Sequence, residues 1–109
     1  MFDKIKYSDP LGNHVYVNGE SFGLEIVSVD LRNHVLKQMK KSIGNPTMII
    51  NVSENERLYC LGITDDHPHF FISHVTIREG EWYVSSTKLE YDKTVIYRMI
   101  NLDKKLYSR

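Results

Sequence analysis

Four short runs of β-forming residues follow one another between residues 46 and 90, and they limit the possible folds more than any other part of the sequence. The runs read TMIINVS, RLYCLGI, FFISHVTI and WYVSSTKLE, and the turn-forming strings ENE, TDDHPH and REGE separate them. Short runs rich in β-branched and aromatic residues, each bounded by turn residues, are typical of an antiparallel meander. The sequence therefore predicts a central antiparallel sheet of about four strands.

The first two runs are apolar on both sides. In the first run Met48 and Ile50 alternate with Ile49 and Asn51, and in LYCLGI apolar residues also stand next to one another. An antiparallel sheet with one face in water shows a regular apolar–polar alternation instead. We therefore expect an α+β fold in which a helix covers each face of the sheet.

The segment before the meander has the pattern of one of these helices. Ser28 or Asp30 can cap its start, and Gly44, Asn45 and Pro46 are typical of its end. Apolar residues recur at helical spacing between these signals and form the stripe that we expect to face the sheet. The stripe consists of Leu31, Val35, Leu36, Met39 and Ile43.

The second helix is expected between residues 91 and 106, with Asp92 as a possible cap. Four apolar residues in this segment fall at helical spacing: Val95, Met99, Leu102 and Leu106. The alternative is a fifth strand through TVIYRMI, so residues 92–106 are left open between a helix and a strand.

The N-terminal part predicts a small β-hairpin. KIKYS and HVYVN alternate in polarity, and DPLGN between them supplies turn residues. Asn18-Gly19 marks a further turn, and FGLEIVSV is expected to be extended. A hairpin alone is marginally stable, so this one should pack on the rest of the chain or on another chain. We expect one domain over residues 1–109, with a hairpin extension at 1–21 and an α+β core at 22–109.

Composition and length limit the class of protein. The chain has 109 residues, and a chain of this size buries roughly 65% of its unfolded surface as one domain. Its 14 basic residues balance 14 acidic ones and form no block beyond Lys40-Lys41 and Lys104-Lys105, so nucleic acid is not an expected partner. The single Cys60 excludes an intrachain disulfide and favours a reducing compartment. With no apolar leader or membrane-length segment in the sequence, we expect a cytoplasmic protein without membrane contact.

The order of elements and several strings resemble the SH2 domain, the module that binds phosphotyrosine peptides. The likeness covers residues 22–102. Val27-Ser28 and the following helix resemble the start of the family's first helix, and PTMIINVS resembles the strand that carries its phosphate-binding arginine. LYCLGI, ISHVTI and GEWYVSS are similar to the strands that follow. The resemblance implies a peptide-binding module.

Only some of the residues with which SH2 domains bind their ligand have a counterpart in this sequence. Asn51 stands at the position of the phosphate-binding arginine, and Val29 at that of the assisting helix arginine. His74 matches the histidine of the later strand, but Thr76 replaces a basic residue. The phosphate loop corresponds to residues 53–56, SENE, whose two carboxylates would repel a phosphate.

The missing arginine is costly for phosphate binding. Removing one partner of a buried charge pair costs about 2–5 kcal/mol, so we do not expect ordinary phosphotyrosine binding. The resemblance instead implies contact with an unphosphorylated peptide or another protein surface. The implied contact residues are Asn51, Ser53, His74 and Thr76.

A polar cluster in the TDDHPH turn offers an alternative function. Carboxylates and imidazoles can hold a divalent metal, which would make the protein a metal-dependent hydrolase or nuclease. The candidate ligands are Asp65, Asp66, His67, His69 and His74. Against this site, His69 and His74 are an odd number of residues apart and would face opposite sides of a strand. The competing interpretation is a polar turn with both of its histidines in solvent.

No nucleophile, phosphate-binding or zinc-protease motif is present, so an enzyme activity and a cofactor are not expected. Cys60 is expected in the core, and the amide of Asn51 should find hydrogen-bond partners. His74 is either a ligand contact or a hydrogen-bonded residue near the core.

The sequence thus predicts a small intracellular protein-interaction module, an adaptor or inhibitor of viral or phage type. An edge strand or the hairpin could form a homodimer, and a structural subunit is a third possibility.

Overall fold

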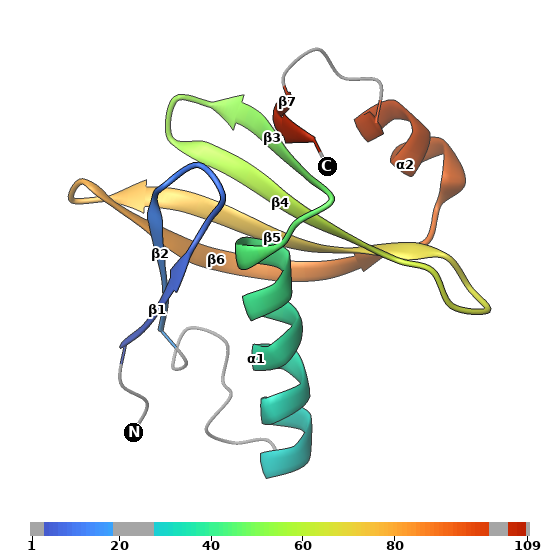
Figure 1. Ribbon diagram of the computed structural model, residues 1–109, viewed down its shortest axis with the longest axis horizontal. Coiled ribbons are helices and arrows are strands. Elements are labelled where there is room, and N and C mark those ends of the chain that lie inside the picture. The colour runs from blue at the N-terminus through green and yellow to red at the C-terminus, as the bar shows by residue number, and fades with distance from the viewer. Residues whose placement is uncertain (1–3, 19–27, 101–104, 109) are drawn as a thin grey trace.

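The computed structural model of the protein describes residues 4–18, 28–100 and 105–108 (Figure 1). Within these ranges seven strands form one sheet, and two helices accompany it. The elements are β1 (Lys4–Ser8), β2 (His14–Asn18), α1 (Val29–Gly44), β3 (Met48–Ser53), β4 (Glu56–Ile63), β5 (His69–Arg78), β6 (Glu81–Glu90), α2 (Lys93–Ile100) and β7 (Lys105–Ser108). Of the expected extended segment FGLEIVSV, residues 22–27 lie outside the described residues, and Val29 is already the first residue of α1.

The sheet has the strand order β1-β2-β6-β5-β4-β3-β7. Strands β3 to β6 form the predicted antiparallel meander, and β1 and β2 form the predicted hairpin. The sequence predicts about four antiparallel strands, which is fewer than the seven strands that the described residues form. β2 pairs in parallel with β6, and β7 pairs antiparallel with β3, so the sheet is mixed. These two pairings join segments that are far apart in the sequence, and a local sequence pattern does not predict such pairings.

Helix α1 begins and ends as its sequence predicts. The Ser28 side chain accepts a hydrogen bond from the Leu31 backbone N–H at 3.2 Å, and the Asn45 N–H donates to the Lys41 carbonyl beyond Gly44. The expected core position of Leu31 is wrong, because 51% of its surface is exposed. The first turns of α1 extend past β6, and only the later turns lie over the sheet (Figure 1).

Apolar side chains are buried on both faces of the sheet, as predicted. The larger cluster lies between the sheet and α1 and includes Met39, Ile43, Ile49 and Tyr59. The smaller cluster on the other face consists of Met48, Ile50, Cys60, Phe70 and Ile72, with Leu58 and Val95 packed against it. Val95 belongs to α2, whereas α1 is the main helix packed on the sheet, so the expectation of a helix on each face is met in part.

Helix α2 is shorter than the sequence pattern indicates. Asp92 caps it as expected, since its Oδ1 accepts a hydrogen bond from the Thr94 N–H at 2.9 Å. The helix ends at Ile100, and Lys105–Ser108 form β7. The predicted helix to residue 106 is therefore wrong in its last part, and the alternative strand through residues 94–100 is also wrong. Tyr107 of β7 packs against the larger cluster, which favours the strand over a further helical turn. Neither helix in the described ranges has the length and apolar character needed to cross a membrane.

Candidate functional site

Strand β1 lies at one end of the sheet and has a strand partner, β2, on one side only among the described residues. The Asp9 N–H donates to the Asn13 carbonyl at 2.9 Å and closes the hairpin. Because bonded and non-bonded pairs alternate in an antiparallel ladder, the backbone of Ile5 and Tyr7 then bonds to β2. The backbone N–H groups of Lys4 and Lys6 point away from β2, toward the open edge. This edge can accept another strand.

A groove of about 600 Å³ runs beside this edge. One side is formed by residues 6–8 of β1, and the other side by the C-terminal half of α1 with Asn45. The two sides are held together, since the Tyr7 hydroxyl donates to the Leu36 carbonyl at 3.3 Å. Burial against α1 also raises the pKa of the Tyr7 hydroxyl, so it stays a donor at neutral pH.

Lysines dominate the lining of this groove. They are Lys6 of β1 and Lys37, Lys40 and Lys41 of α1. All four are exposed. Within residues 4–18, 28–100 and 105–108, no carboxylate lines the groove and no ion pair includes any of the four. The whole chain has a formal charge of zero, so the positive charge of the groove is a local feature.

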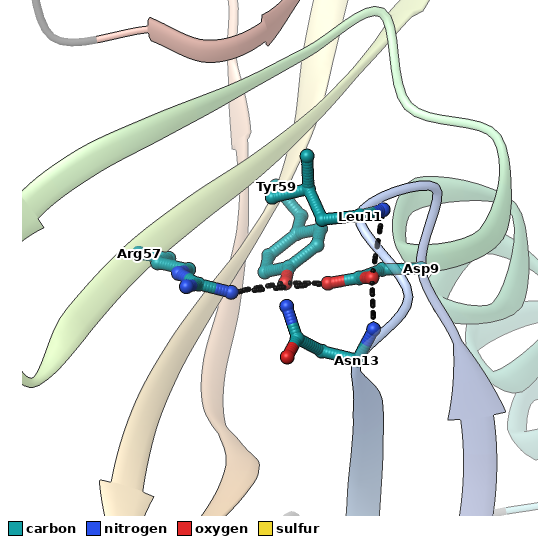
Figure 2. Close-up of polar contacts among 5 residues, drawn as sticks. All are labelled: Asp9, Leu11, Asn13, Arg57 and Tyr59. Carbon is teal, nitrogen blue, oxygen red and sulfur yellow. Dashed lines mark hydrogen bonds and ion pairs between the residues drawn. The ribbon is translucent and has the colours of Figure 1, made fainter.

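A buried carboxylate fastens the hairpin turn to the central sheet (Figure 2). The Asp9 side chain is fully buried, and its Oδ1 accepts hydrogen bonds from the N–H groups of Leu11 and Asn13 at 2.9 and 2.8 Å. The Tyr59 hydroxyl donates to Oδ2 of Asp9, and a guanidinium nitrogen of Arg57 lies 3.9 Å from the same oxygen. Arg57 in turn lies 4.2 Å from the centre of the Trp82 ring. These contacts fix the position of the hairpin, and with it the open edge.

The same contacts perturb the ionisation of Tyr59. Its side chain has no exposed surface, and this burial raises the pKa of the phenol far above its ordinary value. The hydrogen bond to Asp9 raises the pKa further, while Arg57 lowers it by a smaller amount. Tyr59 therefore remains a neutral donor to the Asp9 carboxylate at physiological pH.

A second polar cluster lies on the opposite face of the sheet around His74. Its Nε2 lies 3.0 Å from a Glu56 carboxylate oxygen, and its Nδ1 lies 3.1 Å from the Ser85 hydroxyl. Ser85 is the extra residue of a β-bulge, since Val75 pairs with Val84 and His74 pairs with Ser86. The Ser85 hydroxyl is also 3.1 Å from the His74 carbonyl, to which it can donate.

The His74 cluster borders a pocket of about 350 Å³. Its lining residues are Val52, Leu58, Ile72, His74, Ser86, Thr87 and Lys88. Both ring nitrogens of His74 have protein partners, so the ring is held in place by the sheet and neither nitrogen is open to a ligand. His74 is thus a hydrogen-bonded residue at the border of this pocket, and its role as a ligand contact stays a prediction.

The structure separates the four contact residues that the SH2 resemblance implies. Asn51 pairs with Arg57, whereas His74 pairs with Leu58, the next residue of β4. Successive strand residues face opposite sides, so Asn51 lies on the α1 face and His74 on the other. Thr76 shares the face of His74, and both Ser53 and Thr76 pair with Glu56. Ser53, His74 and Thr76 thus lie near one another, and Asn51 does not join them.

The five candidate metal ligands do not meet at one point. His69 is buried, stacks on Tyr91 with ring centres 4.4 Å apart, and places Nδ1 2.7 Å from the His67 carbonyl. The expectation that both turn histidines are solvated is therefore wrong for His69. Asp65 accepts a hydrogen bond from the His67 N–H, and His74 lies on the opposite face of β5. In the described residues, which include all five candidates, no group of three His, Cys, Asp or Glu side chains is placed to hold a metal ion.

Sequence reasoning did not identify the β1 groove as a site. Lys40 and Lys41 were visible only as a short basic pair, and nothing in the local pattern shows that α1 ends beside β1. Glu56 and Ser85 were likewise missed as partners of His74, because the register shift that exposes Ser85 to the ring depends on how β5 and β6 pair.

Comparisons with protein-family models, curated proteins and solved structures find no match to this chain. The resemblance to SH2 domains therefore remains a prediction that these comparisons do not test.

Proposed function

We propose that the protein is a protein-binding module that takes up an extended segment of a partner as an additional strand along β1. The observation that carries the proposal is the open edge of β1 lying inside a groove whose other side is α1. Extended peptides bind many domains by adding a strand to an exposed sheet edge, where main-chain hydrogen bonds supply affinity and neighbouring side chains supply specificity. An adaptor or inhibitor role follows from this mode of binding.

The edge of β1 is suited to this role because its backbone groups are available and fixed in position. The N–H groups of Lys4 and Lys6 point toward the open edge, and the Asp9–Tyr59 contact helps to hold the hairpin on the sheet. An edge that is held in place before binding loses less conformational entropy on forming the complex.

Peptides selected from a display library of random linear sequences test this proposal. We expect the selected peptides to slow amide hydrogen exchange at Lys4 and Lys6, whose N–H groups become bonded. Exchange at Ile5 and Tyr7 should change less, because these N–H groups already bond to β2. Peptides that protect other parts of the protein and leave these two amides unchanged would overturn the proposal.

A matched pair of variants separates backbone pairing from side-chain contact. Lys6→Pro removes the outward N–H without removing a bond to β2, and proline is tolerated on sheet edges. Lys6→Thr removes the same side chain and keeps the N–H. We expect Lys6→Pro to abolish peptide binding and Lys6→Thr to retain most of it. Equal binding by the two variants would contradict strand addition.

A further inference from the structure

We infer that the partner segment in the β1 groove is acidic and belongs to a different protein, with carboxylates at alternate positions that face the lysines of α1. This inference rests on the proposed strand addition and adds the chemistry of the partner. Among the described residues, four lysines and no carboxylate line the groove, although the chain as a whole carries no net charge.

The lysines of α1 are spaced so that one strand can contact them together. Lys40 and Lys41 follow Lys37 by three and four residues, which places both beside Lys37 on one side of the helix. Ile5 and Tyr7 of β1 also face α1, since both pack against the larger core cluster. Side chains of an added strand that lie level with Ile5 and Tyr7 therefore point toward α1, and every second residue of the partner does so.

The remaining side chains of the partner meet the other surface of the edge. Lys4 and Lys6 point away from the core cluster, on the side of the sheet opposite α1. Lys4 already forms a 3.3 Å ion pair with Glu81, so Lys6 is the lysine left to attract a carboxylate there. The three α1 lysines thus form the main contact, and Lys6 adds to it.

A second copy of the chain does not suit this groove. Pairing two β1 strands would bring two edges that both carry Lys4 and Lys6 against each other, with the α1 lysines of both copies nearby. Like charges placed opposite one another destabilise a strand pair, and edge lysines are a known protection against self-association. The same lysines that oppose self-pairing attract an acidic strand from another protein.

Three synthetic peptides of equal length test the inference. They share one β-forming sequence and carry Glu, Gln or Lys at every second position. Binding is measured by fluorescence anisotropy at low and high salt, and amide exchange at Lys4 and Lys6 is measured in parallel. We expect the Glu peptide to bind about tenfold more tightly than the Gln peptide at low salt, and to lose this advantage at high salt because exposed charges are screened.

Variants test whether the lysines of α1 cause the preference for an acidic peptide. The combined variant Lys37→Gln/Lys40→Gln/Lys41→Gln should bind the Glu and Gln peptides equally, while still protecting the Lys4 and Lys6 amides. Lys93→Gln, which removes an exposed lysine of α2 away from the groove, is the matched control and should keep the tenfold preference.

The outcomes separate failure of this inference from failure of the proposed function. If the Gln peptide protects the Lys4 and Lys6 amides and binds as tightly as the Glu peptide, strand addition stands and the acidic preference is overturned. If no peptide protects these amides, both are overturned. A dimer in sedimentation that Lys6→Pro dissociates would show that a second copy occupies the edge, and would also overturn the acidic partner.

Discussion

The Tyr59 hydroxyl donates a hydrogen bond to the carboxylate of Asp9, 50 residues away in sequence, and joins the turn of the N-terminal hairpin to the middle of β4. Val15 and Val17 of β2, which are buried in the larger core cluster, and the Lys4–Glu81 ion pair also hold the hairpin on the sheet. The register between β2 and β6 covers two residue pairs, Val15 with Trp82 and Tyr16 with Tyr83. Asp9 and its partners add a buried polar anchor at the turn, where the ladder to β6 does not reach.

Tyr59→Phe is expected to destabilise the protein by about 1–3 kcal/mol, because the buried carboxylate of Asp9 loses a hydrogen-bond donor. Denaturant unfolding followed by tryptophan fluorescence measures the loss. Tyr83→Phe is the matched control, since it removes a tyrosine hydrogen bond to the half-exposed carboxylate of Glu81. Its effect should be smaller, and a loss equal to that of Tyr59→Phe would contradict the importance of burial.

Asp9→Ala is expected to loosen the hairpin before it unfolds the sheet. The substitution removes the acceptor for Leu11, Asn13 and Tyr59 and leaves the Arg57 charge without its buried partner. Amide hydrogen exchange should become faster in β1 and β2, while β4 and β5 keep most of their protection. Peptide binding at the β1 edge should fall in parallel. Uniformly faster exchange throughout the sheet would instead indicate that Asp9 supports the whole fold equally.

The elements that could be predicted from the sequence are those with local signals. The meander, the hairpin and the caps of α1 each depend on residues close together in the chain, and the structure contains all of them. The strand β7 and the parallel pairing of β2 with β6 depend on partners far away in sequence. Apolar spacing in residues 91–106 suits a helix, but Tyr107 gains a place in the core only when Lys105–Ser108 pair with β3.

The candidate site shows the same limit. The spacing of Lys37, Lys40 and Lys41 was readable from the sequence, but their proximity to an open strand edge was not, because it requires the hairpin to dock beside α1. The grouping of Asn51 with His74 failed to form for a related reason. Asn51 of β3 pairs with Arg57 of β4, and His74 of β5 pairs with the next residue of β4, Leu58. Since successive strand residues face opposite sides of a sheet, this register places Asn51 and His74 on opposite faces.

Gly80→Ala is expected to cost about 1 kcal/mol, because Gly80 has a φ of 80° in the tight turn between β5 and β6. No heavy atom lies within 4 Å of the added Cβ, so the cost comes from the backbone and not from a clash. Gly44→Ala is the control, since its φ is outside this region and its Cβ would make an ordinary 3.5 Å contact with the Ser8 carbonyl. Thermal unfolding should show a lower midpoint for Gly80→Ala and an equal or higher midpoint for Gly44→Ala, whose backbone alanine can adopt in α1.

The free energy of unfolding is expected to fall as pH rises above about 9. Burial raises the pKa of the Cys60 thiol from 9.0 to about 12, and burial raises the pKa of Tyr59 above 10.0. Above these ordinary values the unfolded chain has released protons that the folded protein still binds, so raising the pH favours unfolding. Below pH 9 the two states bind the same protons at these groups, and the full stability is present.

Cys60→Ala identifies the contribution of the thiol. Between pH 9 and 10 the unfolded chain ionises at Cys60 before it ionises at Tyr59, so this variant should lose the first part of the pH dependence. Urea unfolding at a series of pH values measures the slope. In the native protein the thiol should react with a disulfide reagent at pH 8 only as fast as the sheet opens, since the thiolate is the reactive form and the buried group stays protonated. A fast reaction in the folded protein, or an unchanged slope in Cys60→Ala, would show that Cys60 is more accessible to water than its position in the smaller core cluster indicates.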